Sequence, residues 1–183
     1  VTEYLSSTEA VGGERIWSEE DREANNALVG LRAVRVLSGN QVTSDVRIDQ
    51  DVRVEVDFAN HKPGNRVIVN LRLHDSMGNI VLESADVPGA NSLPASWFER
   101  PMPVGDYTAI CTLPGNLLNE GRYYISLMLA TYHPPKAEVD IPQAIAFSVL
   151  DTGELRTPGF SGRWPGIVRI RLPWQTELLY SLN

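Results

Sequence analysis

Cysteine and lysine are scarce in this sequence. Cys111 is the single cysteine among 183 residues, so no intrachain disulfide can form, and this fits a reducing compartment. Only Lys62 and Lys136 are lysines, and the formal net charge is −7. So acidic a chain lacks the basic surface that general nucleic-acid binding requires, and we exclude nucleic acid as a partner.

Long apolar runs are also absent. None approaches the ~20 residues of a membrane-spanning helix, and no signal-peptide pattern opens the sequence. Because Val1 is not a natural start, we expect a fragment or a processed product. The length still suffices for one medium domain with a sizeable core.

Several motifs of enzymes are missing. The sequence contains no G-x-x-x-x-G-K-[ST] phosphate loop, no G-x-G-x-x-G and no G-x-S-x-G elbow. His61, His74 and His133 are scattered without a C-x-x-C or H-E-x-x-H partner, so we predict no metal site and no cofactor. Cys111 lies within a strand pattern and is expected to be buried and inert. Acidic residues are plentiful, so a glycosidase pair stays open, but no spacing singles one out. We predict a protein that is not an enzyme.

Alternation of apolar residues is what the sequence does contain. Its period of two is typical of strands with one buried face. The segments that show it are residues 28–36, 52–58, 67–75, 107–113, 122–131 and 144–150. The first has one irregularity, which indicates a β-bulge. Turn residues separate the segments and no long helix is indicated, so the pattern predicts an all-β, antiparallel β-sandwich. We expect residues 107–113 and 122–131 to form its central antiparallel pair.

The two ends of the chain differ from the middle. Residues 1–27 carry seven acids and two bases without apolar periodicity, so we predict an N-terminal arm or linker there and a sandwich domain over residues 28–183. Residues 151–166 are rich in glycine and proline, and a last strand is predicted at residues 167–174. A strand on such a hinge can pair within its own domain or reach the sheet of a neighbour.

The non-core positions of two strands carry polar and aromatic side chains. Sugars hydrogen-bond to such polar groups, and their C–H faces stack on aromatic rings. If the two strands are neighbours, these positions form a carbohydrate-binding patch that Trp97 closes from the long loop at residues 85–105. The alternative for each residue is structural, as a solvated face, a packed ring or a loop anchor. The candidate binding residues are Asn70, Arg72, His74, Trp97, Tyr124, Ser126 and Met128.

Four places in the sequence carry a resemblance to a known family. The chain resembles the C-terminal polysaccharide-recognition domain of the ATP-binding subunit of bacterial O-antigen ABC exporters, the Wzt type. The resemblance covers roughly residues 30–175, and its third segment is the most specific. The segments are DQDVRVEV (49–56), LRLHDSMG (71–78), GDYTAICTLPGNLLNEGRY (105–123), and AIAFSVLD (144–151) with the later GIV and LPW.

The resemblance implies an immunoglobulin-like β-sandwich that forms a homodimer by exchanging its C-terminal strand, here residues 167–174. It implies a cytoplasmic location at the inner face of the inner membrane, beside a fused nucleotide-binding domain and a transmembrane transporter subunit. The implied ligand is a lipid-linked bacterial O-polysaccharide, recognised through its non-reducing end for export. The family supplies no binding motif, so the candidate residues rest on the assignment of faces.

Two other functions stay open. A β-sandwich can dock a partner protein through its open face, and an apolar face would favour that alternative. A close pair of buried carboxylates in a cleft would favour a glycan-modifying enzyme.

Overall fold

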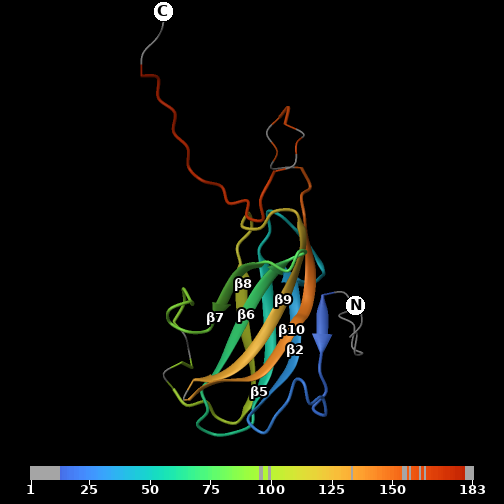
Figure 1. Ribbon diagram of the computed structural model, residues 1–183, viewed down its shortest axis with the longest axis vertical. Helices are drawn as coiled ribbons and strands as arrows, with labels where there is room; N and C mark the ends of the chain where they lie inside the picture. The colour runs from blue at the N-terminus through green and yellow to red at the C-terminus, as the bar shows by residue number, and fades with distance from the viewer. Residues whose placement is uncertain are drawn as a thin grey trace, which may run out of the picture.

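The computed structural model describes residues 13–94, 97, 98, 100–132, 134–153, 156, 158–160, 162 and 164–179. Within this part of the chain every regular element is a strand, and the strands form two sheets that pack face to face (Figure 1). The predicted all-β sandwich is therefore confirmed. None of the described residues belongs to a helix long and apolar enough to cross a membrane.

The first sheet, sheet A, has the order β1-β2-β5-β8, and β3 pairs with β2; all its pairings are antiparallel. The register of β2 against β5 shifts between Leu31 and Ala33, which confirms the irregularity expected in this segment. Its strands are β1 (Glu14–Ile16), β2 (Val29–Ser38), β3 (Gln41–Val42), β5 (Val52–Asn60) and β8 (Gly105–Leu113).

The second sheet, sheet B, has the order β4-β10-β9-β6-β7. Its pairings are antiparallel except that β4 runs parallel to β10. The predicted pairing of residues 107–113 with 122–131 is wrong, because β8 and β9 lie in different sheets. The strands of sheet B are β4 (Asp45–Arg47), β6 (Val67–Asp75), β7 (Ile80–Ala85), β9 (Gly121–Tyr132) and β10 (Pro135–Leu150).

The core lies between the sheets and follows the predicted alternation. In β5 the buried side chains include Val54 and Val56, and in β9 they include Ile125 and Leu127. Burying an aliphatic side chain of this size contributes roughly 1.5–3 kcal/mol. Sheet B therefore keeps its even-numbered β6 and β9 positions on the outer face.

Within the arm that the sequence predicts at residues 1–27, residues 14–16 join sheet A as β1. Strand β1 pairs with β2, and Trp17 and Ala24 belong to the buried core. The Arg15 guanidinium donates a hydrogen bond across the sandwich to the carbonyl of Ala144 on β10, at 3.3 Å. This contact closes one side of the sandwich. Residues 1–12 of the predicted arm lie outside the described residues.

The C-terminal segment does not form the strand predicted at residues 167–174. Its one β-type contact among the described residues is an isolated bridge between Leu118 and Val168. The segment then runs away from the sandwich in an extended conformation (red in Figure 1). A single bridge is not a ladder, and residues 170–179 have no neighbouring strand within the part of the chain that the structure describes.

A set of hydrogen bonds holds the start of this segment. The buried Asn119 side-chain amide donates to the carbonyls of Trp164 and Gly166, and the Tyr123 hydroxyl donates to the carbonyl of Ile167. We call the contacts of Asn119, Tyr123 and Asp151 with residues 153–169 the tail clamp. The clamp fixes the chain as far as Arg169. The segment that projects from the sandwich therefore begins at Ile170, and we call its described residues, 170–179, the C-terminal arm.

Candidate functional site

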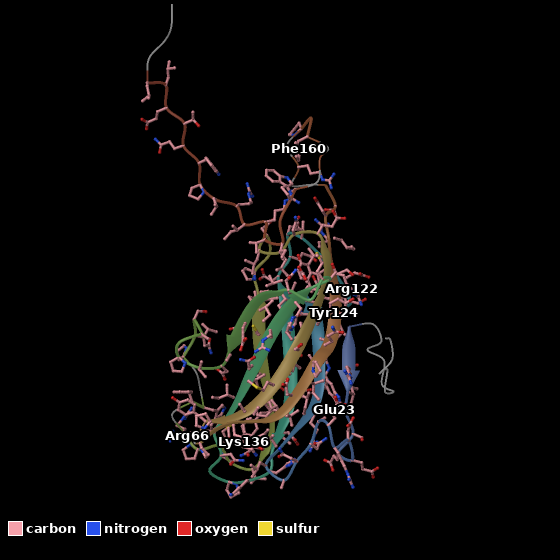
Figure 2. The ribbon with its side chains drawn as sticks, in the orientation of Figure 1. Glu23, Arg66, Arg122, Tyr124, Lys136 and Phe160 are labelled. Carbon is pink, nitrogen blue, oxygen red and sulfur yellow. The ribbon has the colours of Figure 1, made fainter. Side chains whose placement is uncertain are left out.

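Six of the seven candidate residues lie side by side on the outer face of sheet B. Strands β6 and β9 are antiparallel neighbours, and their register pairs the candidates directly across the two strands. We call this surface the sheet B face (Figure 2, where Tyr124 is labelled on β9). The cross-strand pairs are Asn70 with Met128, Arg72 with Ser126, and His74 with Tyr124.

Glu83 on β7 organises one side of this face. Its carboxylate accepts hydrogen bonds from the Asn70 amide at 2.9 Å and from the Arg72 guanidinium at 2.8 Å. The bond from Arg72, followed by that from Asn70, holds the pKa of Glu83 below its usual range. The Arg72 side chain is still 41% exposed. It therefore keeps donors that can reach a ligand, since a guanidinium has five N–H groups.

The centre of the face contains a second hydrogen-bonded pair. The Ser126 hydroxyl lies 3.2 Å from the His74 ring nitrogen Nε2. The same hydroxyl accepts the main-chain N–H of Gln143 at 3.0 Å. A β-bulge between Ile141 and Ile145 places Gln143 there, with φ at 48°. A non-glycine residue in this conformation is strained, and such residues cluster at functional sites.

The sequence analysis missed three residues of this face. Glu83 lies on β7, a strand too short to show a clear alternation. Asp140 pairs with Met128 across β10 and β9, and Gln143 lies in the bulge that follows. The bulge interrupts the period of two, so the sequence pattern marked only residues 144–150 as a strand.

Trp97 lies away from the sheet B face. Its ring packs edge-on against Tyr107 of β8 at a centroid distance of 5.6 Å, and the Arg100 guanidinium lies 5.0 Å from the ring centroid. The ring belongs to the partly buried set that packs against the core. Trp97 therefore anchors its loop on sheet A, which is the structural alternative stated for it.

Two hollows lie elsewhere on the sandwich. A cavity of about 280 Å³ opens between the edge strands β7 and β8, and Cys111 lines it. The Cys111 side chain is half-buried, not fully buried as the sequence predicted, and this burial raises the pKa of its thiol. A polar hollow of about 560 Å³ surrounds Arg32, whose guanidinium donates to Asn25 at 2.6 Å and lies 3.2 Å from His61.

The described residues offer no metal-binding cluster. They contain no group of three or more histidine, cysteine or acidic side chains that could hold a metal ion, and His133 lies outside the described residues. Glu138 and Asp151 have side chains only 4% exposed. Glu138 pairs with Lys136 near the start of β10, whereas Asp151 pairs with Arg169 just after its end. The two carboxylates therefore lie at opposite ends of the strand and do not form a glycosidase pair.

Comparison with known proteins finds the same architecture elsewhere. The crystal structure of the C-terminal domain of Wzt matches 96% of this chain and 100% of that chain, with a TM-score of 0.62 and 14% sequence identity. At this identity the match shows a shared fold. No protein-family model and no curated protein matches the sequence.

Two other solved structures are less similar. A β-glucosidase from Listeria innocua matches 63% of this chain and 16% of its own, with 9% identity and a TM-score of 0.35. The CARDB domain of a Pyrococcus furiosus protein matches 73% of this chain and 100% of its own, with 12% identity and a TM-score of 0.37. Neither match bears on function.

Proposed function

We propose that this protein is a non-catalytic carbohydrate-binding module that recognises a lipid-linked O-antigen polysaccharide, through its non-reducing end, for export by an ABC transporter. The observation that carries the proposal is the sheet B face, where polar side chains and a tyrosine ring line two paired strands. The shared fold with the Wzt C-terminal domain supports it.

The chemistry of the sheet B face suits a sugar. Arg72 and Asn70 offer donors, and Glu83 offers an acceptor between them. The half-buried Tyr124 ring offers a π face, on which the C–H groups of a sugar ring can stack. Polar contacts on one side and an aromatic contact on the other would fix both the position and the orientation of a sugar unit.

The proposal includes the setting that the resemblance implies. The domain would act in the cytoplasm at the inner face of the inner membrane, with a nucleotide-binding domain and a transmembrane subunit as partners. It would form a homodimer by exchanging its C-terminal segment. The exposed apolar side chains of the C-terminal arm support the exchange, because an extended apolar segment can be covered by pairing with the edge of a sheet. These side chains are Ile170, Leu172 and Trp174.

A second function is favoured by that same arm. Exposed leucines continue beyond Trp174, at Leu178 and Leu179. Exposed apolar side chains of this kind mark protein contacts. The domain would then dock a partner protein rather than a glycan.

Binding of the 183-residue chain to a panel of bacterial O-polysaccharides, with and without terminal modification, tests the proposal. Selective binding to one glycan, weakened by Arg72→Ala, is the expected result. A folded protein that binds no member of the panel would overturn the proposal and favour the protein-docking function.

A further inference from the structure

The arm and the loop before it enclose a pocket of about 760 Å³ beyond the end of the sandwich. Its volume lies in the ordinary range for ligand pockets. Arginine supplies every ionisable side chain among the described residues of the lining, in a chain whose net charge is −7. The arginines are Arg156, Arg169 and Arg171, and two tryptophans, Trp164 and Trp174, stand beside them.

One buried carboxylate behind the lining orients two of the arginines. Asp151 accepts hydrogen bonds from Arg169 at 2.7 Å and from Arg156 at 3.2 Å. One carboxylate cannot neutralise three guanidinium groups. Arg171 is exposed and has no hydrogen-bond or ion-pair partner among the residues that the structure describes. Counted over the residues that the structure describes, the pocket therefore keeps a net positive charge and unused donors.

The Trp164 ring is held in place but not covered. The Phe160 ring packs against it at 5.5 Å, and the Arg169 guanidinium lies 5.7 Å from its centroid. The residue is still 48% exposed. An aromatic ring fixed in this way is a platform on which the C–H face of a sugar can stack. Figure 2 shows Phe160 in the loop above the sandwich.

We propose that this pocket binds an oxyanion carried by a sugar unit: a phosphate, sulfate or carboxylate group on a glycan. Guanidinium groups bind such anions through paired N–H donors, and the adjacent Trp164 ring can stack on the sugar that carries the anion. A pocket with a fixed ring suits a discrete ligand better than the flat surface of a membrane. The saccharide part of this inference rests on the proposed function, whereas the anion part rests on the arginines.

The position of the pocket agrees with one ligand spanning both sites. The tail clamp joins the pocket to the beginning of β9, through Asn119 and Tyr123. Tyr124 of the sheet B face follows directly. A glycan on the sheet B face would therefore have its next units close to the arginines.

Titration calorimetry with a matched pair of oligosaccharides, one phosphorylated at its end and one neutral, tests the inference. We expect the wild-type chain to bind the phosphorylated ligand about tenfold more tightly at low salt, with the difference shrinking as salt screens it. Arg171→Gln should remove most of this preference, and Trp164→Ala should weaken both ligands. Lys62→Gln is the charge-matched control, because Lys62 is an exposed cation just after β5 and does not line the pocket. This variant should change neither the affinity for the phosphorylated ligand nor that for the neutral one.

Further arms separate the possible sources of the anion. Equal binding of both oligosaccharides, or a preference unchanged in Arg171→Gln, would overturn the inference while the response to Arg72→Ala still measures the proposed function. Equal affinity for inorganic phosphate and for the phosphorylated ligand would overturn the saccharide part. Binding to phosphatidylglycerol vesicles, without binding to the phosphorylated oligosaccharide, would also overturn the inference and would assign the pocket to a lipid headgroup.

Discussion

The main-chain N–H of Gln143 donates a hydrogen bond to the side-chain hydroxyl of Ser126, 3.0 Å away on the neighbouring strand. A side chain here takes the place of a main-chain acceptor, because the bulge in β10 has moved Gln143 out of the regular ladder. The bulge places Gln143 beside Ser126, which pairs with Arg72 across the two strands of the sheet B face.

We expect Gln143→Ala to weaken glycan binding about three- to tenfold, since it removes the amide but keeps the strained backbone. The free energy of unfolding should change by less than about 0.5 kcal/mol, because the side chain is exposed. Calorimetry and urea unfolding measure the two quantities. Gln41→Ala, on the exposed strand β3, is the control that should change neither, and an unaltered affinity in Gln143→Ala would remove this residue from the site.

Arg72→Ala and Tyr124→Ala are expected to weaken glycan binding, because both side chains point from the sheet B face. The Arg72→Ala variant loses only an exposed ion pair with Glu83, so its free energy of unfolding should stay within ~1 kcal/mol of the wild type. Arg53→Ala removes a similar pair on sheet A and serves as the control. If both variants bind glycan with wild-type affinity, the sheet B face is not the binding site.

Asp151 makes the tail clamp sensitive to acid. Hydrogen bonds from the N–H of Gly153 and from Arg169 lower its pKa to about 2. A carboxyl whose folded pKa lies below its unfolded pKa stabilises the fold above the unfolded value, near ~3.9, and loses this contribution as the pH falls toward the folded value. Asp151→Asn should therefore cost about 1–2 kcal/mol at pH 7 and almost nothing near pH 2. Urea unfolding of both proteins at several pH values measures this difference, and a cost independent of pH would contradict it.

Two truncations separate the clamp from the arm. Removing residues 170–183 leaves every contact of the tail clamp, so we expect a folded monomer that no longer dimerises. Removing residues 163–183 also removes the acceptors of the buried Asn119 amide and one partner of Asp151, which should destabilise the fold by about 1–3 kcal/mol more. Light scattering and thermal unfolding measure both effects. A dimer that survives the shorter deletion would show that the arm is not exchanged.

The faces of the strands were predictable because a period of two fixes them. In β6 the predicted bounds agree with those observed, and the candidate residues do lie on the outer face. The neighbours of each strand were harder to predict than its faces, since the alternation of β9 does not say which strand lies beside it. The same pattern gave the wrong partner for β8, because the loop after Leu113 crosses to the other sheet.

Features without periodicity could not be predicted. Two bulges in β10 break its alternation, so Glu138, Asp140 and Gln143 received no assignment from the sequence. Trp97 sits in a loop, where the partner of a ring depends on tertiary packing. The arginine pocket also escaped prediction, because its lining comes from a loop and an arm that only the clamp brings together.

The single thiol gives the unmodified chain a reporter of its own slow motions. Arg15 ties the sheets together on one side, whereas Cys111 faces the cavity on the other, between β7 and β8. A half-buried thiol with a raised pKa reacts slowly with an alkylating reagent, and it reacts faster when that side separates. The rate of alkylation should therefore rise as the gap between β7 and β8 opens, and it should stay below that of a cysteine in an unfolded peptide. Reaction at the peptide's rate would mean that this gap stands open in solution.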